Sequence, residues 1–227
     1  MIEFQNVFFS YNDGDSSIKN INFSIKSGEC VVLCGKSGSG KSTILRTISG
    51  LAPVFYEGNL KGKVEIDKQI PAEMGSEERA KLFGVVFQDP RSQFFMNNVQ
   101  DEICFAAENI GLSAYEIRRK LDEIVGLVGI EHLLSKNIDE LSSGQKQKVA
   151  IASSLILHPK VLILDEPTSN LDANGVKVLI KIIKKIKDKG ISIIISEHRL
   201  EPFKEVVNRF LYIIKSVYSN TVKVKAR

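Results

Sequence analysis

A glycine-rich turn directly after a continuous apolar run is the feature that most restricts what this chain can fold into. The segment 29–34 contains the run Val31-Val32-Leu33, which is typical of a strand buried on both faces of a sheet. The turn leads into a predicted helix over 41–49, which ends at Gly50. The turn itself has the sequence Gly35-Lys36-Ser37-Gly38-Ser39-Gly40-Lys41-Ser42. This order of strand, G-x-x-x-x-G-K-S and helix is typical of a phosphate-binding loop, so we expect an α/β nucleotide-binding core.

The residue types of this loop suit a nucleoside triphosphate. Its glycines let the backbone curl so that successive N–H groups point at phosphate oxygens, and the helix N-terminus adds partial positive charge. Lys41 would reach the β- and γ-phosphates, and the Ser42 hydroxyl would bind Mg²⁺. The expected nucleotide contacts are Gly35, Lys36, Ser37, Gly38, Ser39, Gly40, Lys41, Ser42 and Thr43. A chance glycine-rich turn is the alternative, and the loop alone does not separate a kinase, a GTPase and a transport ATPase.

A second apolar strand, predicted over 161–164, ends in two carboxylates, Asp165 and Glu166. A carboxylate at the end of a buried strand is costly unless a cation or hydrogen-bond donors meet it. We predict that Asp165 lies on the metal side, directly or through water. Glu166 is displaced by one residue and would polarise an attacking water. The alternative is a surface turn in which the acid pair merely precedes Pro167.

Short apolar strands alternate with helical stretches along most of the chain, which predicts βαβ units. Segments 2–7 and 21–25 alternate apolar and polar residues and are expected to pair as an antiparallel edge layer. Further strands are predicted at 62–66, 84–87, 191–195, 210–215 and 221–225, the last two as a hairpin. Between 88 and 159 helical spacing replaces the strand pattern, over 98–109, 114–128 and 142–157.

These elements predict an α/β fold, in which residues 1–88 and 159–227 form a P-loop NTPase (RecA-like) core with an antiparallel β layer. Residues 89–158 are expected to form an inserted helical subdomain. The segment 176–189 places apolar residues on one face and lysines on the other. A crossover helix packed on the sheet is the favoured interpretation, and a basic helix on a membrane surface is the alternative.

Composition limits the classes of partner. The formal net charge of +4 is mild, so nucleic acid is not implied. Cys30, Cys34 and Cys104 lack metal-ligand spacing and are expected to be buried free thiols, which fits a reducing cytosol. The sequence shows no signal peptide and no apolar run near the ~18 residues of a spanning helix. We therefore expect a soluble protein whose membrane role, if any, comes through a partner.

At this point the chain resembles the ABC ATPase family over essentially its whole length. Leu141-Ser142-Ser143-Gly144-Gln145 is similar to the family's signature motif, with Ser143 where glycine is usual. Ser142 at a helix start is also an ordinary N-cap, but its spacing to the acidic pair favours the signature interpretation. Gln88 matches the Q-loop glutamine, and the segment 169–172, ending in Asp172, matches the D-loop. His198 matches the switch histidine, and Tyr11 matches the aromatic residue that stacks on adenine, with Phe8 and Phe9 as competing core residues.

The resemblance implies an ATP-hydrolysing subunit that uses Mg²⁺ and acts at the cytoplasmic face of a membrane through separate integral transport subunits. Two cassettes would close head-to-tail, either as a homodimer or as a heterodimer. Lys41, Gln88, Glu166 and His198 would then take part in hydrolysis, while Ser42, Gln88 and Asp165 would lie at the metal. Ser142, Gly144 and Gln145 would act on the partner's nucleotide, and Asp172 would lie at the nucleotide as part of the D-loop.

A narrower resemblance links the chain to ATPases of energy-coupling-factor transporters, which import vitamins or transition-metal ions. It rests on the segments 86–93, 100–105 and 196–201. Two other functions compete. A non-transport ABC protein acting in repair or on ribosomes would need a long coiled coil or a second cassette, neither of which is seen here. A small-molecule kinase would not need the segment 141–145.

Overall fold

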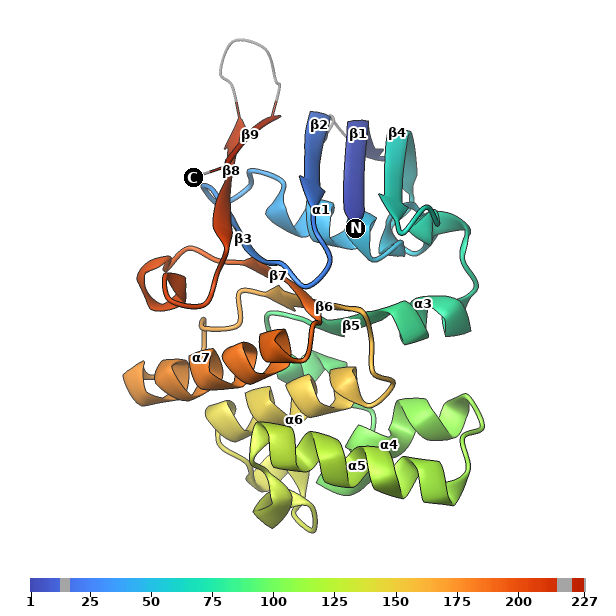
Figure 1. The fold of residues 1–227 in the computed structure, drawn as a ribbon, viewed down its shortest axis with the longest axis vertical. Helices are drawn as coiled ribbons and strands as arrows, with labels where there is room; N and C mark the ends of the chain where they lie inside the picture. Colours follow the sequence, from blue (N-terminus) through green and yellow to red (C-terminus); the bar gives the residue numbers. More distant parts are fainter. Residues whose placement is uncertain (13–16, 216–221, 227) are drawn as a thin grey trace.

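The computed structural model describes residues 1–12, 17–215 and 222–226. Its elements form a three-stranded antiparallel sheet, a six-stranded sheet and a group of helices at the end opposite the antiparallel sheet (Figure 1). The strands are β1 (Ile2–Tyr11), β2 (Ile18–Ile25), β3 (Cys30–Cys34), β4 (Gly58–Ile66), β5 (Phe83–Val86), β6 (Val161–Asp165), β7 (Ser192–Ser196), β8 (Arg209–Lys215) and β9 (Val222–Ala226). The helices are α1 (Lys41–Ile48), α2 (Leu51–Val54), α3 (Ser76–Leu82), α4 (Val99–Asn109), α5 (Ala114–Val128), α6 (Ser143–Leu155) and α7 (Ala173–Asp188).

The antiparallel sheet has the strand order β2-β1-β4. The predicted pairing of segments 2–7 and 21–25 is confirmed, although both strands are longer than the alternating pattern indicated. The prediction that the next strand begins at residue 62 is wrong, because β4 begins at Gly58. The first residues, Gly58-Asn59-Leu60-Lys61, contain a single apolar side chain, so they show no repeated alternation, and they pair with the end of β1.

Gly62 marks a bulge in the pairing of β1 with β4. The register of the two strands shifts between Gln5 and Phe8, and Asn6 has a φ of 50°. Gly62 has a φ of 86°, and a Cβ placed on it would lie 2.1 Å from the Asn6 carbonyl oxygen. Glycine is therefore required here both by the backbone conformation and by the close approach of the neighbouring strand.

We predict that Gly62→Ala lowers the free energy of unfolding by at least about 2 kcal/mol, from left-handed strain together with a backbone clash. Urea denaturation monitored by circular dichroism would measure this. Gly111→Ala is the matched control, because Gly111 also has a positive φ of 74° but nothing lies within 4 Å of its added Cβ. An equal loss of stability in both variants would show that the contact with Asn6 is unimportant.

The larger sheet has the order β5-β6-β7-β3-β8-β9 and is parallel except for β9, which pairs with β8 in the antiparallel sense. The predicted hairpin is thus confirmed for the described residues, while Thr221, the predicted start of its second strand, lies outside them. Side chains of β3 alternate between two cores. Val31 and Leu33 pack with α1 and the antiparallel sheet, whereas Cys30 and Val32 face the cluster that includes α6 and α7. Burial on both faces explains the apolar run.

The helical stretches were predicted with ends within three residues of the observed ones. Helices α4, α5 and α6 lie together at one end of the molecule (Figure 1). The short helices α2 and α3 were missed. Helix α3 has a polar sequence with Leu82 as its single buried residue, so it has almost no apolar periodicity to detect.

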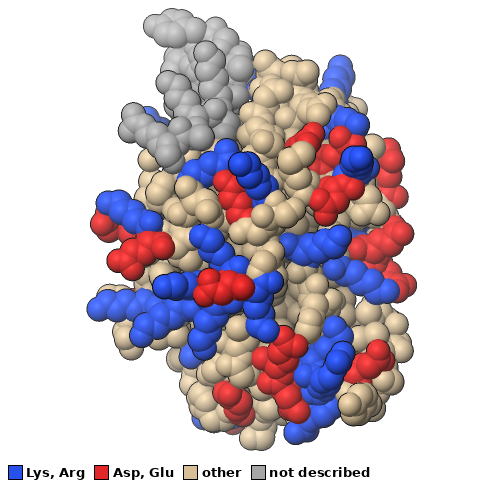
Figure 2. Space-filling view, in the orientation of Figure 1, with Lys and Arg blue, Asp and Glu red and all other residues tan. Residues whose placement is uncertain are grey.

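Helix α7 confirms the crossover interpretation of the segment 176–189. It buries Val176, Leu179, Ile182, Ile183 and Ile186. Lys and Arg side chains gather over its outer face, with acidic side chains among them (Figure 2). Because the apolar face is already covered by the core, it is not available to a membrane surface. No helix in the described part of the chain is long and apolar enough to cross a membrane.

Candidate nucleotide site

The phosphate-binding loop connects β3 to α1, as the sequence predicts. Gly35 lies so close to neighbouring groups that a Cβ on it would be 2.6 Å from the Ile213 carbonyl oxygen and 2.8 Å from the Ser39 hydroxyl. Gly38 and Gly40 have φ values of 72° and 96°. These positions therefore need glycine for two separate reasons, close packing at the first and a left-handed backbone at the other two.

Lys41 extends back across this loop. Its side chain is buried, and its Nζ donates to the carbonyl oxygens of Gly35 at 3.0 Å and Lys36 at 3.2 Å. The tip of the loop, Lys36 to Gly38, is exposed to solvent. The buried Ser39 hydroxyl has no hydrogen-bond partner among the described residues. A curled backbone, a held ammonium group and an unsatisfied hydroxyl suit a chain of phosphate oxygens.

The acidic pair lies at the carboxyl end of β6, one strand away from β3 across β7. Glu166 has a φ of 44°, a left-handed conformation that is costly for a residue with a side chain. Its backbone N–H donates to the carbonyl oxygen of Ser196 at 3.1 Å and lies 3.2 Å from the hydroxyl of the same serine. The strained backbone is therefore held by the end of β7, as expected where a side chain must take a particular direction.

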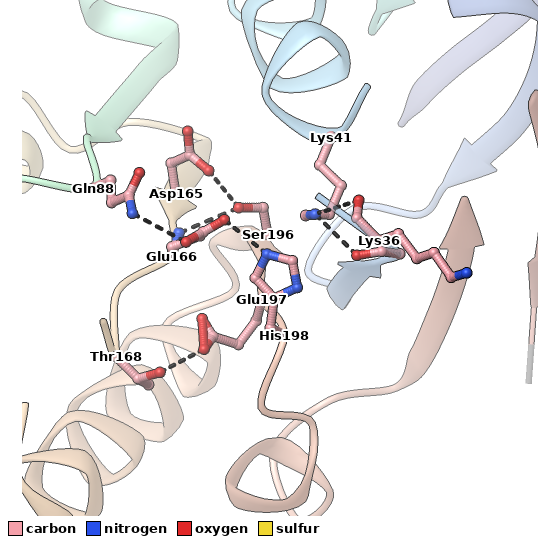
Figure 3. A network of polar contacts seen from close by, with 10 residues as sticks. Lys36, Lys41, Gln88, Asp165, Glu166, Thr168, Ser196, Glu197 and His198 are labelled. Carbon is pink, nitrogen blue, oxygen red and sulfur yellow. Dashed lines mark hydrogen bonds and ion pairs between the residues drawn. The ribbon is translucent and has the colours of Figure 1, made fainter. Parts of the chain in front are cut away.

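The Glu166 carboxylate contacts two residues that lie far from it in the sequence. Gln88 Nε2 donates to one carboxylate oxygen at 3.1 Å, and His198 Nε2 lies 3.0 Å from the other (Figure 3). Gln88 follows β5, Glu166 follows β6 and His198 follows β7. Because these strands are parallel, all three side chains lie at the carboxyl end of the sheet. The phosphate-binding loop starts at the same end of the sheet: the N–H of Glu197, just after β7, donates to the carbonyl oxygen of Leu33 near the end of β3.

The oxygen groups near this edge fit Mg²⁺. Asp165 accepts a hydrogen bond from the Ser196 hydroxyl through one carboxylate oxygen, and Ser42 lies in the first turn of α1. The described residues contain no group of three or more His, Cys, Asp or Glu side chains placed to hold a metal ion. Such a sparse oxygen set is what Mg²⁺ uses when phosphate oxygens and waters supply its remaining ligands.

Tyr11 lies at the end of β1 beside α1. Its hydroxyl lies 3.2 Å from the Thr43 hydroxyl and accepts from Arg46 at 3.0 Å. Phe9 is fully buried and meets Tyr11 edge-on at 4.9 Å between ring centroids, whereas Phe8 is exposed on the opposite side of the strand. Phe9 is therefore a core residue, whereas Tyr11 contacts the first half of α1, the helix that follows the phosphate-binding loop.

The signature and D-loop residues cap two helices. Ser142 caps α6 in a reciprocal pair with Gln145, whose Oε1 accepts from the Ser142 N–H at 2.9 Å. Asp172 caps α7 by accepting from the Gly175 N–H at 2.7 Å. Together with Gly144 they line a groove of about 400 Å³ to which no residue of the phosphate-binding loop contributes. Within one chain, the structure therefore does not bring these residues to the loop.

Sequence reasoning missed three residues of this region, Ser196, Thr168 and Glu197. Ser196 holds both Asp165 and Glu166, and Thr168 and Glu197 form a buried pair below them. The available signal was an uninterrupted stretch of polar residues, 196–199, directly after an apolar strand. That signal shows that the strand ends there but not which way each side chain points.

Comparison with known proteins agrees with this geometry. The family model described as "ABC transporter" matches residues 18–169. An ABC transporter ATP-binding protein of Treponema denticola is 40% identical over 212 residues, which cover 93% of this chain and 43% of that protein. The chain thus spans less than half the length of this curated relative.

Solved structures show the same fold. CbiO1 of Clostridium perfringens, described as part of the ABC transporter complex cbiONQ, is 33% identical with a TM-score of 0.87 and covers 99% of this chain and 87% of its own. A dimeric post-hydrolysis structure of the ATP-binding cassette MJ0796 with ADP and Pi is 26% identical with a TM-score of 0.81, covering 100% and 98%. The predicted P-loop core with an antiparallel β layer and helices is confirmed. The chain belongs to the ABC transporter family, as one of its ATP-binding proteins.

Proposed function

We propose that this chain hydrolyses ATP as the motor subunit of a membrane transporter. The observation that carries the proposal is the contact of one carboxylate, Glu166, with both Gln88 and His198 at the sheet edge where the phosphate-binding loop begins. A carboxylate base can serve a kinase as well as an ATPase, and it is the membership of the ABC transporter family that favours water as the acceptor. The arrangement suits transfer of the γ-phosphoryl group to water.

In this proposal the loop N–H groups and Lys41 bind the triphosphate, with Tyr11 stacking on the adenine. Glu166 orients a water and takes its proton as the water oxygen attacks the γ-phosphorus and the bond to the β–γ bridging oxygen breaks. His198 contacts the γ-phosphate, and Gln88 touches the attacking water or the metal. A Mg²⁺ ion held by Ser42, Asp165 and Gln88 would supply charge neutralisation on the phosphates.

We propose further that a second cassette, identical or different, completes the site. Ser142, Gly144, Gln145 and Asp172 line a groove away from their own phosphate-binding loop, so they are available to a partner's nucleotide. The helix N-terminus of α6 offers N–H groups for a γ-phosphate. Support comes from the dimeric cassette structure found by comparison.

Gly144→Val tests this partner role. A Cβ on Gly144 would meet only Leu171 Cδ2, at the ordinary contact distance of 3.8 Å, so the first carbon of the added side chain is accommodated within the chain. We expect unchanged thermal stability and unchanged ATP binding by the monomer, with loss of ATP-dependent dimers and of ATPase activity, measured by light scattering and phosphate release. Dimers and turnover at the wild-type level would contradict the proposal.

The membrane partners and the cargo are also proposals. We propose that residues 89–158 form a helical unit between a core of residues 1–88 and 159–227, and that integral subunits bind the chain at the cytoplasmic face of the membrane.

The likeness to CbiO1, named as part of cbiONQ, together with the segments 86–93, 100–105 and 196–201, supports an energy-coupling-factor type that imports a vitamin or a transition-metal ion. Purification of the tagged chain from membranes, with identification of the co-purifying integral protein, tests this. A partner without membrane segments would overturn it.

A further inference from the structure

Three consecutive residues, which begin with the last residue of β7, contact three residues of the segment 165–168, which begins with the last residue of β6. The Ser196 hydroxyl donates to Asp165, His198 lies against the Glu166 carboxylate, and Glu197 accepts from the Thr168 hydroxyl (Figure 3). Two of these contacts involve groups of the proposed hydrolytic site. The third, between Thr168 and Glu197, is the innermost, because both residues are buried.

A charged Glu197 side chain is energetically unfavourable at this buried position. Its side chain is 3% exposed, one carboxylate oxygen has no hydrogen-bond partner among the described residues, and no basic side chain forms an ion pair with it there. Burial raises the pKa of its carboxyl group, and hydrogen bonds from Thr168 and the Arg199 backbone oppose that rise only in part. A neutral acid or an amide would occupy this site at lower cost than a carboxylate.

Thr168 lies in the turn that carries the proposed base into the D-loop. The N–H of Ser169 donates to the Glu166 carbonyl oxygen, and the N–H of Leu171 donates to the Thr168 carbonyl oxygen. The turn is therefore stiffened by its own backbone. Its side-chain anchor on the neighbouring loop is the contact of Thr168 with Glu197.

We infer that Glu197 is a positioning residue that, by accepting the Thr168 hydroxyl, holds the D-loop turn and the switch-histidine segment in register, so that His198 and Glu166 meet. The inference rests on the proposed function. It assigns Glu197 no contact with nucleotide. The hydrogen bond fixes the relative position of His198 and Glu166, whereas the affinity for nucleotide depends on the loop around Lys41.

The test uses the variants Glu197→Ala, Glu197→Gln and Thr168→Val in the full chain, with kcat, KM and the Kd for ATP measured separately. We expect Glu197→Ala and Thr168→Val each to lower kcat about three- to tenfold, as for the loss of one hydrogen bond, with the Kd for ATP within twofold of wild type. The double variant should lose no more than either single variant. Glu197→Gln should restore kcat, because its amide oxygen still accepts from Thr168.

Glu29→Ala is the matched control. Glu29 is another largely buried glutamate, paired with Arg209 just before β3, at the sheet edge opposite the site. We expect it to lower the melting temperature without changing kcat. Should Glu197→Ala fold poorly, Thr168→Val still tests the bond, because it removes one hydroxyl and keeps the shape.

An unchanged kcat in Thr168→Val, additive losses in the double variant, or a Glu197→Gln variant as slow as Glu197→Ala would each overturn the inference. Absence of ATPase activity in the wild-type chain with its partners would instead overturn the proposed function, so the two failures are distinguishable.

Discussion

Glu166→Gln is expected to lower kcat for ATP hydrolysis by about 10²–10⁴-fold, the range that a positioned general base contributes. The amide keeps the size of the side chain and still presents an oxygen to Gln88 Nε2, so the local contacts persist. It cannot take a proton from water at neutral pH. ATP should therefore still bind, and ATP-bound dimers should accumulate because the step that opens them is slowed.

Phosphate release and size-exclusion chromatography with ATP measure the two halves of this prediction. Glu201→Gln is a matched control, because Glu201 is an exposed glutamate that pairs with Lys204 on the surface. The control should turn over ATP at the wild-type rate. If Glu166→Gln keeps more than a tenth of wild-type kcat, another residue is the base and the roles assigned around it fail.

Lys41→Ala is expected to weaken ATP binding by about 10- to 100-fold, which is the effect of losing charge-assisted hydrogen bonds to phosphate oxygens. Among the described residues, the Lys41 ammonium donates to two loop carbonyls, at 3.0 and 3.2 Å, and the loss of these two bonds should still allow the protein to fold. A ligand that binds only the folded state raises its stability in proportion to RT ln(1 + [L]/Kd). Added MgATP should therefore raise the melting temperature of the wild type and raise that of Lys41→Ala much less.

The control for this variant is Lys184→Ala, which removes an exposed lysine of α7 far from the loop in the chain. It should keep the wild-type response to MgATP. An equal rise of melting temperature in Lys41→Ala and the wild type would contradict the placement of the triphosphate over this loop. Isothermal titration calorimetry with a non-hydrolysable ATP analogue would measure the Kd directly, without hydrolysis during the experiment.

Several elements were predictable because their signal is local. The strand β3, the loop and α1 follow from an apolar run, a glycine pattern and a helical period, all within about twenty residues. Gln88 and His198, by contrast, were assigned only through the family resemblance, and it is the ends of parallel strands that bring them to Glu166 in the structure.

Other features depend on partners distant in the sequence. The first residues of β4 are ordered only by pairing with β1, and Gly62 is required by the approach of Asn6. Phe9 and Tyr11 could not be told apart as core and border residues until β1 had a register. The Thr168–Glu197 contact joins residues that are 29 positions apart and have no shared motif.

The nucleotide loop, the acidic pair and the fold class were predictable from spacing along the chain, because spacing encodes local backbone conformation and strand order, and the family followed from the resemblance of the motifs. Which side chains touch could be seen only in the folded chain: Gln88 and His198 both contact Glu166, Ser196 holds the strained turn, and a buried acid lies beneath them. The physical reason is that a side chain's direction and burial depend on packing between strands, and packing is settled by the whole sheet rather than by any one segment.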